Sequence, residues 1–212
     1  MKRLALIGSK EFADQIQCFA EKTGEYKVIG FFDDFEPKGK IIRSLPILGK
    51  INEIEDIYKT GVFDYIFLAA GYNNFKFRED VFDGLHGKVP FANIIMPSAR
   101  IAPDVKLGEG VFVGGGTIID KGCEIGNNVF IHGSSTVGHE NVVGSHTYFS
   151  GRFNSAGFAT IGKRCFFGIC TCVSDHITIC DDVWIGLACV VAKNIKEPGK
   201  YMSPAAKLYK IE

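Results

Sequence analysis

Two patterns of apolar residues divide the sequence near residue 93. Before that point, short apolar runs typical of buried strands alternate with segments whose apolar residues recur every three or four positions, as in helices. These elements, strand and helix in turn, are 3–8, 11–22, 26–34, 51–59, 63–71 and 74–85. Such alternation predicts a small parallel sheet flanked by helices, so we expect an α/β domain over residues 1–93.

A strict six-residue period begins at Ile95 and runs to Val191. It contains 17 positions, of which 14 are Leu, Ile or Val, two are Phe and one is Ser155, and it never slips. A small or β-branched residue recurs within each hexad, and glycine often follows the large one. This combination predicts short flat strands stacked as a parallel β-helix, with about three hexads in each coil and glycine at the corners.

The strand ends of the α/β domain form a candidate ligand-binding rim. In parallel sheets ligands bind at the carboxyl ends of the strands, where backbone N–H groups face anions. The residues expected there are Gly8, Ser9, Asp33, Asp34, Gly71 and Asn73. The first turn, "GSKEF", lacks the GxGxxG fingerprint of a dinucleotide site. It therefore leaves two readings, a plain turn with a helix N-cap or a mononucleotide site.

Charge and composition exclude several other functions. Lys+Arg and Asp+Glu number 24 each, so no basic field favours nucleic acid or an anionic membrane. No apolar run approaches the roughly 20 residues of a membrane span, and the apolar start is too short for a signal peptide. We therefore expect a cytoplasmic protein. The seven cysteines form no CxxC pair, which predicts reduced packing thiols and no metal knuckle; Cys170 and Cys172 have no partners spaced for catalysis.

Several segments resemble one family across nearly the whole chain. They are "LALIGS", "GFFDD", "LAAGYNN", "FANIIMPSARIAP", "VGHENVVG", "AGFATIGKRCFFGI" and "SPAAKL". These segments resemble the left-handed β-helix (hexapeptide-repeat) acyltransferases with a Rossmann-like N-terminal domain, namely the bacterial nucleotide-amino-sugar N-acetyltransferases and the sialic acid O-acetyltransferases. The resemblance implies that residues 1–93 bind a nucleotide sugar through the rim. It also implies that residues 94–212 form the acetyltransferase domain with a C-terminal tail, and that the protein is a homotrimer using acetyl-CoA and no metal.

The resemblance also implies roles for particular residues. His139 of the His-Glu pair would be the catalytic base, with Glu140 as its supporting acid. Histidine titrates near neutrality and can take the proton of an attacking amine. Gly157, one coil above His139, could donate its N–H to the developing oxyanion. The residues expected at acetyl-CoA are Tyr148, Gly157, Gly168, Ile169 and Lys207.

The sequence departs from the family pattern at three places. Tyr148 stands where a second histidine is common, which leaves open whether Tyr148 or His146 takes its role. The junction reads Met96-Pro97-Ser98-Ala99 in place of HPSA, and the usual GxPAK segment is one residue longer, ending at Lys207.

The predicted reaction is direct N-acetylation of the amino group of a UDP- or dTDP-linked amino-deoxysugar for a surface glycan, with the 4-amino position preferred to the 3-amino position. The alternatives are a sialic acid O-acetyltransferase and a trimeric scaffold that only binds sugar nucleotides. A zinc lyase with His132, His139 and His146 gathered across a trimer interface is a weaker alternative. Such an enzyme needs no N-terminal nucleotide domain, and a seven-residue spacing moves each histidine round a corner of a six-residue repeat. We expect His86, His132 and His176 to be solvated surface residues.

Overall fold

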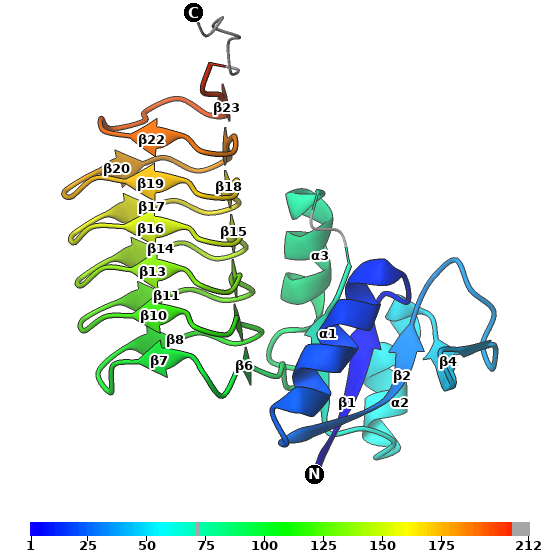
Figure 1. Ribbon diagram of the computed structural model, residues 1–212. Helices are drawn as coiled ribbons and strands as arrows, with labels where there is room; N and C mark the ends of the chain where they lie inside the picture. The colour runs from blue at the N-terminus through cyan, green and yellow to red at the C-terminus, as the bar shows by residue number, and fades with distance from the viewer. Residues whose placement is uncertain (71–72, 205–212) are drawn as a thin grey trace, which may run out of the picture.

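The computed structural model describes residues 1–70 and 73–204 and contains an α/β part beside a tall stack of short strands (Figure 1). The α/β part has a five-stranded sheet in the order β3-β4-β2-β1-β5, parallel except where β3 meets β4. The strands are β1 (Lys2–Ile7), β2 (Tyr26–Phe32), β3 (Ile41–Ile42), β4 (Leu45–Gly49) and β5 (Tyr65–Leu68). The helical elements are α1 (Glu11–Lys22), the 3-10 turn Ile51–Glu53, α2 (Ile54–Lys59) and α3 (Phe75–Leu85).

Local sequence explains where these helices begin and which face they bury. Ala13, Ile16 and Ala20 recur at helical spacing on α1 and are buried against the sheet. Asn74 precedes α3, and its side-chain Oδ1 accepts the Phe77 N–H at 3.0 Å, which caps the helix. The β3–β4 hairpin was not predicted, since its sequence contains no clear strand pattern.

The second part is a left-handed parallel β-helix, in agreement with the predicted fold class. Its strands lie in three sheets of orders β22-β19-β16-β13-β10-β7, β20-β17-β14-β11-β8 and β23-β21-β18-β15-β12-β9-β6. Paired strands lie 18 residues apart, as Ile118 and Thr136 do, except in the last pair, where Val183 of β21 meets Gly199 of β23. The strands from β6 to β14 are Ile94–Ile95, Arg100–Ile101, Lys106–Leu107, Phe112–Val113, Ile118–Ile119, Glu124–Ile125, Phe130–Ile131, Thr136–Val137 and Val142–Val143. Those from β15 to β23 are Tyr148–Phe149, Asn154–Ser155, Thr160–Ile161, Phe166–Phe167, Cys172–Val173, Thr178–Ile179, Val183–Ile185, Val190–Val191 and Gly199–Tyr201.

Corners between these sheets recur every six residues. The left-handed backbone conformation there falls mostly on residues other than glycine, such as Asn128, Glu140 and His146. The glycines that follow the large aliphatic residues serve close packing between coils instead. A Cβ on Gly138, for example, would lie 2.7 Å from the backbone of Ala156 in the next coil.

The large hexad positions of the β-helix core are apolar except at Ser155. The aliphatic hexad residues fill it, and Ser155 is only 6% exposed. The fully buried side chain of Asn141 donates to Ser155 Oγ at 2.6 Å and to the Ala156 carbonyl at 3.0 Å, and its Oδ1 accepts the Ala159 N–H. The single polar residue among the large hexad positions is therefore the partner of a buried amide.

A column of aromatic rings joins the two parts. One ring per coil projects from the outer face of the sheet that contains β9 to β21, and neighbouring centroids lie 3.9 to 5.7 Å apart. The column consists of Phe112, Phe130, Tyr148, Phe166 and Trp184. Phe12 and Phe19 of α1 pack on it at 5.3 Å each, so helix α1 covers this face of the β-helix.

No helix in residues 1–70 or 73–204 is long and apolar enough to cross a bilayer.

Candidate functional site

A cavity of about 1010 Å³ lies between the sheet of the α/β part and the β-helix. On the α/β side it is lined by the ends of β1, β2 and β5, together with Lys10 and Phe35. On the β-helix side it is lined by His132, Tyr148, Ser150, Gly151 and Ile169. Both parts of the chain therefore contribute to one binding space.

Hydrogen bonds hold the predicted rim in place. The buried Ser9 hydroxyl donates to Asp33 Oδ2 at 2.6 Å, and Asp33 Oδ1 accepts the Phe35 N–H at 3.0 Å. The guanidinium of Arg43 donates to the Ser9 carbonyl at 2.6 Å. Asp34 accepts the Ile51 N–H at 2.9 Å, at the start of the 3-10 turn. The rim is thus held together by hydrogen bonds within the chain itself.

Four of the six predicted rim residues line the cavity: Gly8, Ser9, Asp33 and Asp34. Gly8 has a φ of +103°, and a Cβ there would lie 2.9 Å from the Ala69 carbonyl oxygen, so only glycine fits. Asn73 is exposed and outside the lining, whereas its neighbour Asn74 is in the lining. Gly71 lies outside the described residues.

His132 belongs to the cavity, although the sequence predicted a solvated surface residue. Its Nε2 lies 2.8 Å from the Tyr148 hydroxyl, and burial lowers the pKa of the imidazole below its ordinary 6.5. A signal for this location is present in the sequence. Aromatic residues recur every 18 positions beside it, from Phe112 to Trp184, and such an outward apolar column must be covered by another part of the chain.

His139 lies at a different corner, just after β13. Its half-buried ring sits under Gly157 of the next coil, where an added Cβ would be 2.5 Å from both Cε1 and Nε2. Phe158 packs edge-on against the ring at 4.9 Å. Gly157 is buried, and its N–H donates to no acceptor in the described part of the chain. An unused backbone donor therefore adjoins the imidazole.

Glu140 points the other way along the stack. Its carboxylate packs against Gly122 in the coil below, whereas His139 packs on the coil above. Within residues 1–70 and 73–204, no hydrogen bond joins the Glu140 carboxylate to the His139 imidazole. The supporting role of Glu140 thus stays a prediction.

The His139 corner and the cavity lie at opposite edges of one β-helix face. Strand β13 (Thr136–Val137) separates His139 from the corner that begins at His132, and His139 is not in the cavity lining. The residues predicted for acetyl-CoA divide in the same way. Tyr148 and Ile169 line the cavity, with Gly168 beside Ile169, while Gly157 lies at the His139 corner. Lys207 falls outside the described residues.

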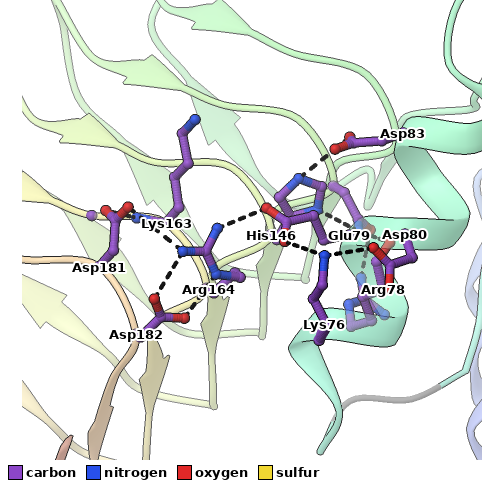
Figure 2. Close-up of polar contacts among 12 residues, drawn as sticks. Lys76, Arg78, Glu79, Asp80, Asp83, His146, Lys163, Arg164, Asp181 and Asp182 are labelled. Carbon is purple, nitrogen blue, oxygen red and sulfur yellow. Dashed lines mark hydrogen bonds and ion pairs between the residues drawn. The ribbon is translucent and has the colours of Figure 1, made fainter. Parts of the chain in front are cut away.

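The third corner of the coil carries a polar network between the two parts, shown in Figure 2. Fully buried Arg78 of α3 donates to Asn128 Oδ1 at 2.6 Å and to the Ala70 carbonyl at 3.0 Å. Burial lowers the pKa of Arg78 to about 10, so it stays charged at neutral pH. Arg164 bridges Glu79 and Asp182 at 2.7 Å each. This network fixes α3, and with it the end of β5, against the β-helix.

The histidines spaced by seven residues do not gather within the chain. His132 and His139 occupy two corners, and His146 occupies the third, where its Nδ1 faces Asn128 at 3.0 Å. A zinc site made of these three side chains in one subunit is therefore not formed.

Comparison with known proteins agrees with this architecture. Residues 3–85 match the PglD N-terminal domain family. The acetyltransferase domain of PglB from Neisseria gonorrhoeae is 21% identical, with a TM-score of 0.85, over 98% of this chain and all of that one. PerB from Caulobacter crescentus, solved in complex with CoA and GDP-perosamine, is 25% identical with a TM-score of 0.82, over 99% of this chain and 98% of that one.

A curated relative matches a shorter stretch. The UDP-3-O-acylglucosamine N-acyltransferase of Janthinobacterium sp. (strain Marseille) is 34% identical over 141 residues, which are 66% of this chain. The chain spans 38% of the length of that relative. Residues 3–85 therefore belong to the PglD N-terminal domain family, and the chain as a whole has the fold of the PglB acetyltransferase domain and of PerB.

Proposed function

We propose that this protein transfers the acetyl group of acetyl-CoA to the amino group of a nucleotide-linked amino-deoxysugar. The observation that carries the proposal is the packing of the His139 imidazole on Gly157, a buried residue whose N–H donates to no acceptor in the described part of the chain. A base and an oxyanion donor side by side are what acyl transfer to an amine requires.

The reaction proceeds by direct attack. The neutral amine adds to the thioester carbonyl, and His139 takes the proton that the nitrogen loses. The Gly157 N–H donates to the oxyanion of the tetrahedral intermediate. When the tetrahedral intermediate collapses, the amide forms and the carbon–sulfur bond breaks. The imidazolium of His139 returns the proton to the sulfur, and CoA leaves as the thiol. Glu140 would stabilise that imidazolium through the electrostatic field of its carboxylate.

The cavity between the two parts supports a nucleotide sugar as the acceptor. Its organised rim offers Ser9, Asp33 and Asp34 to the nucleotide, and its volume is large enough for a sugar beyond it. PerB was solved with GDP-perosamine and CoA, and the PglB domain with acetyl coenzyme A. For this chain we propose, as the sequence predicted, that the nucleotide is UDP or dTDP and that the 4-amino group of the sugar is the acceptor.

We further propose a homotrimer in which each active site takes residues from two chains. The rim cavity and His139 lie at opposite edges of one face, so adjacent prisms can bring the cavity of one chain to the His139 of another. Both edges carry exposed apolar side chains, Phe158 at 48% and Ile169 at 58%, which a neighbouring subunit would cover. We also propose that residues 1–93 form the nucleotide-sugar-binding domain and residues 94–212 the acetyltransferase domain, and that the protein is cytoplasmic.

The test is thiol release from acetyl-CoA with UDP-, dTDP- and GDP-linked 3-amino and 4-amino sugars. We expect turnover with one of these sugars and a loss of about 100-fold or more in kcat for His139→Ala. The control is His86→Ala, which removes an exposed histidine of the α/β part that is outside the cavity lining. Full turnover by His139→Ala would overturn the assigned base. Turnover of a free sialic acid would favour O-acetylation, and nucleotide-sugar binding without any turnover would favour a scaffold.

A further inference from the structure

We propose that His132 and Tyr148 form a hydrogen-bonding pair that recognises the acceptor sugar, with His132 positioning the Tyr148 hydroxyl. This inference rests on the proposed function of the cavity and adds a specificity element supplied by the β-helix.

The geometry holds the Tyr148 hydroxyl in one place. The ring is 6% exposed and is stacked between Phe130 at 4.9 Å and Phe166 at 5.7 Å, which prevents it from swinging away. Its hydroxyl meets His132 Nε2 at 2.8 Å. Both side chains line the cavity opposite Ser9 and Asp33. A ligand that the rim holds by its nucleotide therefore extends toward this pair.

Charge in the cavity is confined to the rim side. The charged lining residues there are Lys10, Glu11, Asp33 and Asp34. The β-helix wall contributes Ser150, Gly151 and Ile169 besides the pair, and burial keeps the His132 imidazole uncharged at neutral pH. The wall thus offers hydrogen bonds without formal charge.

An uncharged imidazole and a phenol each have one donor and one acceptor. Together they can satisfy a sugar hydroxyl or a neutral amine, both of which donate and accept. A carboxylate placed there would lose its hydration without gaining a cation, which is costly. The pair therefore favours an uncharged sugar ring over a sugar acid.

His132 acts on the sugar chiefly through Tyr148, which separates its role from that of a direct contact. Tyr148→Phe keeps the stacked ring and removes only the hydroxyl. His132→Ala removes the partner, and His132→Gln restores a polar group near the position of Nε2. If His132 positions the hydroxyl, the effects of Tyr148→Phe and His132→Ala will not add in the double variant.

The test measures binding as well as turnover. UDP, dTDP and GDP are titrated by calorimetry, and so are their 4-amino sugar derivatives, for wild type and each variant. We expect Tyr148→Phe and His132→Ala each to lower the affinity for the sugar nucleotide by about tenfold and to leave the affinity for the free nucleotide unchanged. His132→Gln should recover part of the lost affinity. In turnover, KM for the sugar should rise about as much. Tyr65→Phe and His86→Ala serve as matched controls.

The outcomes separate this inference from the proposed function. Suppose that no sugar is turned over, but that the sugar nucleotide still binds more tightly than the free nucleotide and this difference depends on Tyr148. That result would support the pair and count against the acetyltransferase proposal. Equal affinity of wild type and Tyr148→Phe for the sugar nucleotide would overturn the pair, whatever the turnover. An equal loss for free nucleotide and sugar nucleotide would also overturn it, because the effect would then lie in the rim. Thermal unfolding midpoints within about 2 °C of wild type show that the variants are folded.

Discussion

The imidazole of His139 lies directly against the Cα of Gly157 in the next coil. A methyl group at residue 157 would sit 2.5 Å from Cε1 and Nε2 of the ring, well inside van der Waals contact. Since Gly157 has an ordinary negative φ, alanine there strains no backbone, and its effect falls on the ring.

We therefore predict that Gly157→Ala lowers kcat by at least about tenfold while leaving the fold intact, because a displaced base loses its alignment with the amine. Steady-state kinetics and circular dichroism check this. Gly84→Ala is the control: nothing lies within 4 Å of its added Cβ, and alanine suits a helix interior. Wild-type kcat in Gly157→Ala would mean that His139 does not act from this position.

Subunit mixing tests whether the active site is shared. His139→Ala keeps the rim, and Asp33→Ala keeps His139, so neither homotrimer should turn over at the normal rate. After joint refolding at equal amounts, about one site in four combines an intact rim with an intact His139 from a neighbour. Recovery of roughly a quarter of wild-type activity is the expected result. No recovery, with mixed trimers verified by native mass spectrometry, would place rim and base in the same chain.

Ser155→Val should destabilise the protein even though it places an apolar residue at the one polar hexad position. The substitution removes the acceptor 2.6 Å from Asn141 Nδ2, leaving one donor of a fully buried amide unsatisfied. We expect the free energy of unfolding to fall by about 1–3 kcal/mol in urea denaturation. Ile161→Val, at the next hexad position, measures the ordinary cost of changing a core side chain. A more stable Ser155→Val protein would contradict the role given to this pair.

The free energy of unfolding should fall as the pH drops below about 6.5. Burial lowers the pKa of both His132 and His146; at His146, Asp83 partly offsets this, and Arg78 adds to it. Unfolded imidazoles then protonate before folded ones, so the unfolded chain binds more protons in this range. The decline ends once the folded pKa values have been passed.

Urea titrations at pH 7.5 and 5.5 measure this difference. A His132→Gln/His146→Gln variant should show a smaller difference between the two pH values. Asp182, whose pKa is lowered by the hydrogen bond from Arg164, titrates below its ordinary 3.8 and does not contribute in this window. A pH-independent free energy of unfolding would contradict the prediction.

Removing divalent metals should change neither turnover nor stability. Ligand atoms of Glu79, Asp83 and His146 lie within 4.8 Å of one another, in the arrangement of a small metal site. However, Arg78 can only donate, so it fixes Asn128 with its amide nitrogen toward His146 Nδ1. The neutral ring then carries its proton on Nε2, the atom that faces Asp83 and that a metal would need. Dialysis against EDTA with metal analysis checks this, and stoichiometric zinc lost together with activity would refute it.

The repeat made most of the fold predictable. A period that holds from Ile95 to Val191 fixes which side chains face inward, and the alternation before it fixes the α/β part. The hairpin of β3 (Ile41–Ile42) and β4 (Leu45–Gly49) could not be predicted from the sequence. Its strands lack a clear apolar pattern, and β4 is held by pairing with the edge of β2.

The site was less predictable than the fold. Coil spacing alone brings Gly157 over His139, since the two are 18 residues apart. The location of His132 depends on the α/β part covering one face of the β-helix, a tertiary contact that the spacing does not encode. The separation of the cavity from the His139 corner depends on which face of the β-helix the α/β part covers. It therefore could be seen only in the structure.

The buried Asn141–Ser155 contact bears on how the chain finds its alignment during folding. Coils built from nearly identical hexads could stack one repeat out of step while burying almost the same aliphatic surface. Such a shift would set Asn141 against an aliphatic neighbour and leave its amide without an acceptor. One polar pair can thus mark a unique starting point in an otherwise repetitive assembly, much as a single buried asparagine sets the pairing of two coiled-coil helices.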